Sequence, residues 1–197
     1  MAQLYFRYGT MNAGKSLQLL AVKHNYEEKG EKVWVVTSAL DDRNGVGKVT
    51  SRVGLETEAT AISRDDPLEI EWGYYLTKNK GELPACVLVD EAEFLTTEQV
   101  SDLAAIVDEY GVPVICYGLK VDFMGRLFEG SKALLELADK IEEIKTVCQF
   151  CDNKATMNLR LADGKPVREG EQVVIGDSEY ISVCRNHYYS PVIKEDK

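Results

Sequence analysis

A segment near the start of the chain has the residue types and spacing that bind phosphate. Residues 9–16 read Gly-Thr-Met-Asn-Ala-Gly-Lys-Ser, the pattern G-x-x-x-x-G-K-S. Glycines let backbone N–H groups curl around phosphate oxygens without Cβ clashes, and a helix that begins here adds partial positive charge. Lys15 would reach the β- and γ-phosphates, and the Ser16 hydroxyl would fill one Mg²⁺ position. The pattern therefore predicts an ATP and Mg²⁺ site made of Gly9, Thr10, Met11, Asn12, Ala13, Gly14, Lys15 and Ser16.

Two carboxylates follow a second apolar run. Cys86–Val89 predicts a buried parallel strand, and Asp90 and Glu91 come directly after it. Ligands collect at the carboxyl edge of open α/β sheets. Asp90 could hold Mg²⁺ through water, as the second acidic motif of P-loop proteins does, which leaves Glu91 free to act as a base. The alternative is a strand that ends in ordinary surface acids, and the phosphate-binding motif favours the functional interpretation.

Three cysteines and a histidine form two short pairs near the C-terminus. Cys148-x-x-Cys151 is followed, after 32 residues, by Cys184-x-x-His187. Thiolates and imidazole at these spacings suit tetrahedral Zn²⁺, and four protein ligands make a closed, structural site. A redox Cys-x-x-Cys is the alternative, but it leaves the second pair without a role. Zinc would staple both ends of the segment between the pairs, which either covers a second substrate or forms a hairpin that only helps folding.

The elements that must position these residues alternate between apolar strands and helices. A strand at Leu4–Tyr8 and a helix over 15–28 flank the phosphate-binding motif. Further elements are expected as strands at 33–36, 48–51, 60–62, 86–89, 113–117 and 141–147, and as helices at 66–78, 96–110 and 131–140. This alternation predicts an α/β domain with a mostly parallel sheet over residues 1–147. A small zinc-stapled β domain over 148–191, with a strand at 155–161, and a frayed tail over 192–197 complete the expected organisation.

Composition limits the class of partner. The chain has 197 residues and a formal net charge of −10, which argues against nucleic acid or an anionic membrane as a partner. No apolar run approaches the length of a membrane span, and the N-terminus lacks the pattern of a signal peptide. Five cysteines beside an ATP site indicate a reducing, cytoplasmic setting, where clustered cysteines bind metal. The isolated Cys116 is interpreted as a core residue.

Two loops carry residues with two possible roles. The polar stretch over 39–48 contains Asp41 and Arg43, which either act near the phosphates or belong to a solvated surface loop. The stretch over 118–130 contains Leu119 and Phe123, which either pack against the core or line a pocket.

In combination, these motifs resemble those of the type II thymidine kinases, the zinc-containing cytosolic deoxynucleoside kinases. The resemblance runs from Ala2 to about Tyr189. Its specific segments are Gly-Thr-Met-Asn-Ala-Gly-Lys-Ser, Asp-Asp-Arg, Val-Leu-Val-Asp-Glu-Ala-Glu-Phe, Cys-Tyr-Gly-Leu, Gly-Glu-Gln-Val-Val-Ile-Gly and Ser-Val-Cys-Arg-Asn-His-Tyr. It implies a RecA-like P-loop core with a small zinc domain and a lasso-like loop, and transfer of the ATP γ-phosphoryl to the 5′-hydroxyl of thymidine.

Roles for individual residues follow from the resemblance. Lys15, Ser16 and Asp90 match the phosphate and Mg²⁺ contacts, and Glu91 matches the proposed base. Asp41 and Arg43 match an Asp-x-Arg near the transferring phosphoryl. Positions that enclose the thymine or read it through the backbone are matched by Met11, Phe94, Leu119, Phe123, Val173, Val174, Ile175, Gly176, Asp177 and Tyr180. The resemblance also implies a homotetramer that thymidine triphosphate (dTTP) inhibits.

Two positions depart from the family pattern. Glu93 stands where the family usually has Gln, and a carboxylate cannot donate a hydrogen bond as an amide does. Asp177 stands where the family commonly has a second glycine, and the segment up to Tyr180 is one residue shorter. Two rival functions remain: a small P-loop kinase for another nucleoside, and a RecA-like ATPase or zinc-ribbon module that binds nucleic acid, against which the net charge argues.

Overall fold

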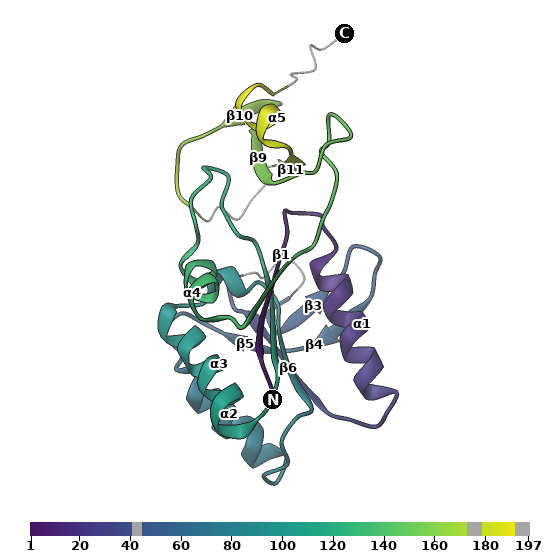
Figure 1. Ribbon diagram of the computed structural model, residues 1–197, viewed down its shortest axis with the longest axis vertical. Coiled ribbons are helices and arrows are strands. Elements are labelled where there is room, and N and C mark those ends of the chain that lie inside the picture. Colours follow the sequence, from purple (N-terminus) through teal and green to yellow (C-terminus); the bar gives the residue numbers. More distant parts are fainter. Residues whose placement is uncertain (41–44, 173–178, 192–197) are drawn as a thin grey trace.

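A parallel sheet forms the centre of the molecule. The computed structural model describes residues 1–40, 45–172 and 179–191. The sheet has six strands in the order β5-β2-β6-β7-β1-β8, and each neighbouring pair is parallel (Figure 1). The strands are β1 (Leu4–Tyr8), β2 (Val33–Ser38), β5 (Thr60–Ile62), β6 (Cys86–Val89), β7 (Val114–Gly118) and β8 (Lys140–Glu143). This topology confirms the expected α/β core with a mostly parallel sheet.

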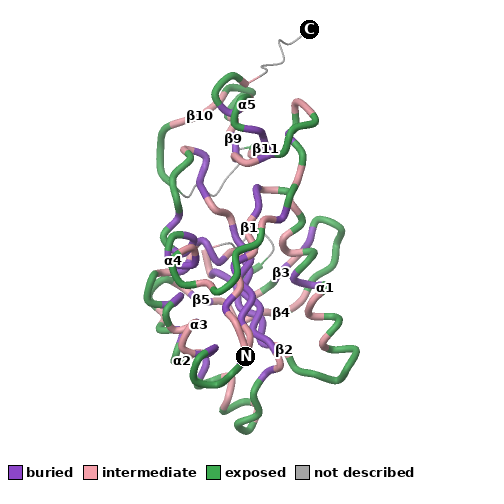
Figure 2. The backbone as a smooth tube through the Cα atoms, viewed as in Figure 1, coloured by how far each residue is buried: buried purple, intermediate pink, exposed green. Residues whose placement is uncertain are grey.

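Helices cover both faces of the sheet, so its strands are apolar on both sides (Figures 1 and 2). Trp34 and Val36 of β2 pack in one core cluster, and Val35, between them, packs in the other. Leu19 and Leu20 of α1 (Lys15–Glu27) cover the second cluster. The first cluster is covered by α2 (Leu68–Lys78), α3 (Thr97–Tyr110) and α4 (Glu129–Leu137).

The order of the strands places the phosphate loop and the acidic pair at one edge. The loop over residues 9–14 follows β1, and Asp90 follows β6. One strand, β7, lies between β1 and β6. Since all these strands are parallel, their carboxyl ends meet at the same edge, where P-loop proteins bind nucleotide. The fold therefore brings together two motifs that lie far apart in the sequence.

A small lobe, which we define as residues 148–172 and 179–191, lies beyond this edge (Figure 1). Its antiparallel sheet has the order β10-β9-β11. The elements are β9 (Met157–Ala162), β10 (Lys165–Val167), β11 (Glu179–Val183) and α5 (Arg185–Tyr189). Its own core contains Leu159, Val183 and Tyr188. The predicted domain boundary after residue 147 falls between β8 and β9 and stays a prediction.

Several element boundaries differ from those expected. The last helix and the last strand of the core, α4 and β8, are both shorter than predicted. Helix α4 ends at Leu137 because Ala138 is already extended (φ −69°, ψ 134°) and Asp139 accepts a 2.7 Å hydrogen bond from the Leu4 N–H. After Ile144, whose N–H donates to the Tyr8 carbonyl at 2.7 Å, the chain leaves the sheet. Three strands were not predicted, namely β4 (Glu56–Glu58), which pairs with β3 (Lys48–Thr50), and β10 and β11 of the small lobe, which pair with β9.

Other local predictions are confirmed. The hydroxyl oxygen of Thr96 accepts from the Gln99 N–H at 3.2 Å, and the Gln99 side chain accepts from the Thr96 N–H at 3.0 Å, which is the expected capping box. Cys116 is completely buried in the sheet. Within the described part of the chain, no helix combines the length and apolarity needed to cross a membrane.

Candidate active site

The phosphate loop has a shape that its glycines make possible. Gly14 has φ 84° at the N-cap of α1, a left-handed conformation that glycine adopts without strain. A Cβ atom at Gly9 would lie 2.9 Å from both the Ala13 Cβ and the Ile144 carbonyl oxygen, so only glycine fits there. The loop N–H groups and the N-terminus of α1 thus form the kind of concave turn that binds phosphate.

The loop is joined to the acidic strand by a direct contact. The Ser16 hydroxyl donates a 2.8 Å hydrogen bond to Oδ2 of Asp90, a buried residue. The Lys15 ammonium donates to the Thr10 carbonyl at 3.0 Å, so it lies against the loop. The structure therefore places Lys15, Ser16 and Asp90, all predicted from the sequence, in one site.

Glu91 has an unusual backbone conformation. It follows Asp90 directly, has φ 53°, and is the N-cap of η1, the short 3₁₀ helix Ala92–Phe94. Non-glycine residues rarely adopt a positive φ, and such residues gather at functional sites. The chain turns away from the direction of β6 at Glu91, and the residue is partly exposed. A partly exposed carboxylate beside the phosphate loop suits a base, the role predicted for Glu91.

Glu93 is a buried carboxyl group with an altered pKa. It is 1% exposed, and neither oxygen has a hydrogen-bond partner of regular geometry among the described residues. Burial raises the pKa of the Glu93 carboxyl to about 7, against the lowering effect of Lys15 and of the amide groups of Glu93 and Leu119, while Asp90 raises it further. In the sequence, Glu93 stood out only as a departure from the family pattern, and its burial was not predicted.

The predicted nucleoside residues form two aromatic contacts. Phe123 and Tyr180 lie edge to face with ring centroids 6.4 Å apart, and the Arg160 guanidinium lies 5.2 Å from the centre of the Phe123 ring. Phe94 and Phe128 form a second edge-to-face pair at 5.7 Å. Phe123 is 1% exposed, so in this structure it belongs to the core as well as to the proposed pocket.

Asp122 organises the loop that carries Leu119 and Phe123. Its carboxylate accepts from the N–H groups of Met124 and Arg126 at 2.8 and 2.9 Å, and from the Gln172 side chain at 3.0 Å. Asp122 was not among the residues predicted from the sequence, although an Asp side chain that accepts a hydrogen bond from the N–H two residues later is typical of a turn. Asp122 therefore stabilises the loop and joins it to Gln172 of the small lobe.

Two further residues missed in the sequence hold the phosphate loop from the small lobe. The N–H of Met11 donates to Oδ1 of Asn158 at 2.8 Å, and the hydroxyl of Ser182 donates to the Met11 carbonyl. Both side chains are buried. Met11 and Asn158 are 147 residues apart in the chain. No local sequence signal could therefore reveal these contacts.

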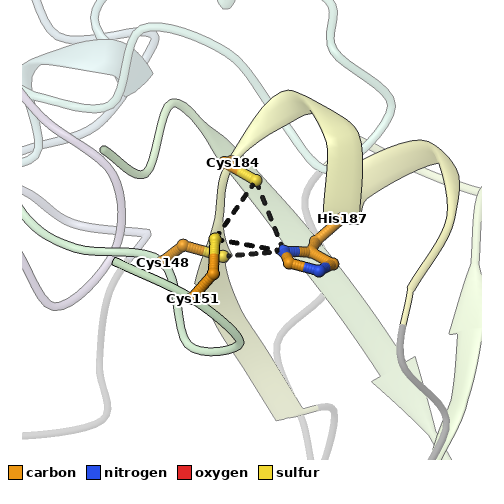
Figure 3. Close-up of side chains that lie close together, drawn as sticks. All are labelled: Cys148, Cys151, Cys184 and His187. Atoms are coloured by element: carbon orange, nitrogen blue, oxygen red, sulfur yellow. Dashed lines mark hydrogen bonds between the residues drawn. The ribbon is translucent and has the colours of Figure 1, made fainter. Parts of the chain in front are cut away.

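The four predicted zinc donors converge in the small lobe (Figure 3). Cys148 and Cys151 precede β9, Cys184 follows β11, and His187 lies on α5, with all donor atoms within 4.8 Å of one another. The sulfur-to-Nδ1 distances are 3.4–3.5 Å, and the Cys151 and Cys184 sulfurs are 3.9 Å apart. Tetrahedral zinc predicts about 3.6 Å and about 3.8 Å for these separations. The donor set therefore fits zinc.

One thiol of this cluster, that of Cys148, differs in acidity from the buried core thiol of Cys86. Burial alone would raise the pKa of Cys148, but N–H groups of Cys184 and Phe150, together with His187, lower it to about 6. Burial raises the pKa of the Cys86 thiol to about 12. A metal binds thiolate, so the surroundings of Cys148 favour the form that zinc requires, while Cys86 in the core stays a thiol.

The remaining predicted residues lie outside the described part of the chain. These are Asp41, Arg43, Val173, Val174, Ile175, Gly176 and Asp177. Leu119 is half-buried beside β7, and Met11 is half-buried in the phosphate loop.

Comparison with known families decides which kind of P-loop protein this is. The family model described as thymidine kinase matches residues 2–188. The chain belongs to the thymidine kinase family. The match includes the phosphate loop, the acidic pair and all four zinc donors, and it confirms the resemblance seen in the sequence.

Individual relatives in the thymidine kinase family match over their whole length. The thymidine kinase of Streptococcus gordonii is 57% identical over 98% of this chain and 99% of its own. Those of Streptococcus pyogenes serotype M3 and Lactococcus lactis subsp. lactis are 55% and 56% identical over 98% of this chain and 100% of theirs. A solved Pif1 helicase from Candida albicans matches with TM-score 0.41 and 14% identity, over 73% of this chain and 36% of its own.

Proposed function

We propose that this chain is a thymidine kinase that transfers the γ-phosphoryl group of ATP to the 5′-hydroxyl of thymidine. The observation that carries the proposal is the family match over residues 2–188, which includes a site in which Ser16 and Asp90 are in contact. In the reaction, the bond between the γ-phosphorus and the β–γ bridging oxygen breaks and a bond to the 5′ oxygen forms. ADP leaves, and the hydroxyl proton passes to a base.

The donor side of the site would hold ATP mainly through the phosphate loop. Loop N–H groups and the N-terminus of α1 bind the phosphate oxygens, and Lys15 moves from the Thr10 carbonyl to the β- and γ-phosphates. Mg²⁺, held by the Ser16 hydroxyl and by Asp90 through water, would neutralise charge on these phosphates. Phosphoryl transfer depends on positioning and charge neutralisation, and these residues supply both.

The acceptor side would use Glu91 as the general base. Its carboxylate must come within about 2.6–3.2 Å of the 5′-hydroxyl, or reach it through one water. Asp41 and Arg43 are proposed to act near the transferring phosphoryl, where a guanidinium stabilises developing negative charge. The proposed roles for Glu91 and Arg43 are complementary, since one accepts the proton and the other neutralises charge on the phosphoryl group.

The nucleoside would lie between the core and the small lobe. We propose that Met11, Phe94, Leu119, Phe123 and Tyr180 enclose the thymine, and that residues 173–177 read its edge through backbone groups. Contacts between Phe123 and Tyr180, and between Asp122 and Gln172, support this, since they join the two sides of the proposed pocket. Zinc in the small lobe would have a structural role, because all four donors come from the protein.

Other properties are proposed from the family resemblance and the composition. They are a cytoplasmic location, a homotetrameric assembly, inhibition by dTTP and no nucleic-acid or membrane partner. The net charge of −10 supports the last of these. Analytical ultracentrifugation and inhibition kinetics test the assembly and the inhibitor.

The first experiment measures ADP release with ATP and Mg²⁺ in the presence of thymidine, deoxycytidine, deoxyadenosine or deoxyguanosine, each added alone. We expect turnover with thymidine. Turnover with another nucleoside only would make the chain a kinase of that nucleoside. ATP hydrolysis that DNA stimulates, without phosphorylation of any nucleoside, would support the nucleic-acid alternative and contradict the proposal.

A further inference from the structure

Asn158 and Ser182 form a pair that grips one residue of the phosphate loop. They are directly opposite each other on the antiparallel strands β9 and β11. Asn158 accepts from the Met11 N–H at 2.8 Å, and Ser182 donates to the Met11 carbonyl. The N–H and the carbonyl of Met11 are therefore both hydrogen-bonded by side chains of the small lobe, in place of the backbone partners that a neighbouring strand would provide.

The identity of each side chain suits its partner. Oδ1 of Asn158 accepts from Met11 while its Nδ2 donates to the Val121 carbonyl at 3.1 Å, so the amide uses an acceptor and a donor at once. A carboxylate or an aliphatic side chain could not make both bonds. Asn158 and Ser182 are 3% and 7% exposed, so loss of either bond would leave a buried backbone group without a partner.

The orientation of Met11 sets the orientation of its neighbours. In a trans peptide the C=O of one residue and the N–H of the next point in opposite directions. Because the Met11 N–H points to Asn158, the Thr10 carbonyl points away from the small lobe. There it accepts from Lys15 Nζ at 3.0 Å and from the Ala13 N–H at 3.3 Å. In the same way, the bond from Ser182 to the Met11 carbonyl directs the Asn12 N–H away from the lobe.

We propose that Asn158 and Ser182 are positioning residues of the ATP site, which set the phosphate loop and the starting position of Lys15 from the small lobe. The inference rests on the proposed function in so far as the phosphate loop binds ATP. It adds a role for the small lobe in holding the phosphoryl donor, in addition to covering the nucleoside.

The small lobe itself holds the pair in place. The Ser182 carbonyl accepts from the Gln149 N–H at 2.9 Å, and the Val183 carbonyl accepts from the Thr156 N–H at 2.9 Å. Gln149 follows the zinc donor Cys148, and Ser182 lies two residues before Cys184. The grip on Met11 is thus built into the same backbone that carries the cysteine and histidine cluster.

The test compares binding of ATP and thymidine by calorimetry in full-length, zinc-loaded protein. The variants are Ser182→Ala, Ser182→Thr, which keeps the hydroxyl, and Asn158→Leu, which keeps the size of the side chain. Ser190→Ala, at an exposed position of the same lobe, is the matched control. Zinc content and the unfolding midpoint are measured for each protein.

We expect Ser182→Ala to weaken ATP binding about 3- to 10-fold and Asn158→Leu about 5- to 50-fold, the range for a lost or unsatisfied buried hydrogen bond. The KM for ATP should rise more than kcat falls, and Ser182→Thr should restore it. In Ser182→Ala, the affinity for thymidine should change less than the affinity for ATP, because the lost hydrogen bond is to the backbone of the phosphate loop.

The outcomes separate this inference from the proposed function. If the wild type binds ATP and Ser182→Ala binds it equally well, this inference is overturned and the proposed function is not. Equal losses of ATP and thymidine affinity would also overturn it, because they indicate a general structural role. If Asn158→Leu does not fold, the Ser182 variants decide. A wild type that binds no ATP would overturn the proposed function, and this inference with it.

Discussion

The Ser16 hydroxyl lies 2.8 Å from Oδ2 of Asp90, although 74 residues separate the two in the chain. Ser16 lies at the start of α1, which follows β1, and Asp90 follows β6, so the contact joins segments whose strands are separated by β7. It shows that the two P-loop motifs belong to one site. Glu91, the next residue, is held at the same edge by its left-handed turn.

Replacement of Glu91 tests the base. We expect Glu91→Gln to bind ATP normally and to lose about 10²- to 10⁴-fold in kcat, the range for removal of a general base. Single-turnover phosphorylation of thymidine is the measurement, and Glu98→Gln, at an exposed position on α3, is the control. A Glu91→Gln protein with a near wild-type rate would remove Glu91 from this role.

Glu93 gives the protein a predictable dependence of stability on pH. Its pKa is raised from 4.5 to about 7 by burial, so the folded protein holds the proton over a range where the unfolded protein has released it. The free energy of unfolding therefore falls as the pH rises from about 4.5 to about 7, and this contribution is level above that. Glu93→Gln cannot ionise and should be more stable than the wild type at pH 8, by up to about 3 kcal/mol.

Urea unfolding at pH 5.5, 7 and 8 measures this effect. The difference between Glu93→Gln and the wild type should grow with pH up to about 7 and then stop growing. Glu109→Gln, at an exposed position of α3, is the control and should follow the wild type. A difference that does not change with pH would show that the Glu93 carboxyl does not titrate in this range.

Two glycine substitutions of the same size should have opposite effects. In Gly9→Ala, the new Cβ would lie 2.9 Å from Ala13 and from the Ile144 carbonyl, so we expect a loss of about 1–3 kcal/mol in stability and weaker ATP binding. Gly73→Ala places its Cβ in open space within helix α2, and we expect a gain of about 0.5–1 kcal/mol. Thermal unfolding with and without ATP tests the pair, and equal effects would contradict the close packing at Gly9.

Zinc removal should affect both substrates. Cys148→Ser should lower the metal content below the one zinc per chain expected for the wild type, and it should loosen the small lobe. Because this lobe bonds Met11 and carries Tyr180, we expect at least a fivefold loss of affinity for ATP as well as thymidine. Cys116→Ala, in the core sheet, is the control and should retain zinc. Full affinity for ATP in the zinc-free variant would show that the metal does not support the phosphate loop.

Motifs with short spacing could be predicted from the sequence, and long-range contacts could not. Residues 9–16, Asp90 and the zinc donors follow local patterns, and the structure brings each group together as expected. The burial of Glu93 depends on η1, whose left-handed start at Glu91 has no local signal. Asn158 and Ser182 look like ordinary strand residues, and only the packing of the lobe on the loop reveals their partners.

Boundaries failed where tertiary contacts overrode local preference. The last strand of the core was expected to continue to residue 147, but it ends at Glu143 because the chain turns toward the small lobe. The helix expected over 131–140 begins two residues earlier and ends at Leu137, since Asp139 bonds the first strand. The apolar pattern was correct in both cases, and the ends were set by residues distant in sequence.

The bonds between Met11 and the small lobe bear on how far this enzyme can be divided or recombined. A fragment that stops at residue 147 would keep every element of the six-stranded sheet, yet it would lack the partners of both Met11 backbone groups. Such a fragment would not be a self-sufficient nucleotide-binding module. Exchange of small lobes between relatives would therefore have to keep the asparagine and the serine together, as a matched pair inherited with the phosphate loop.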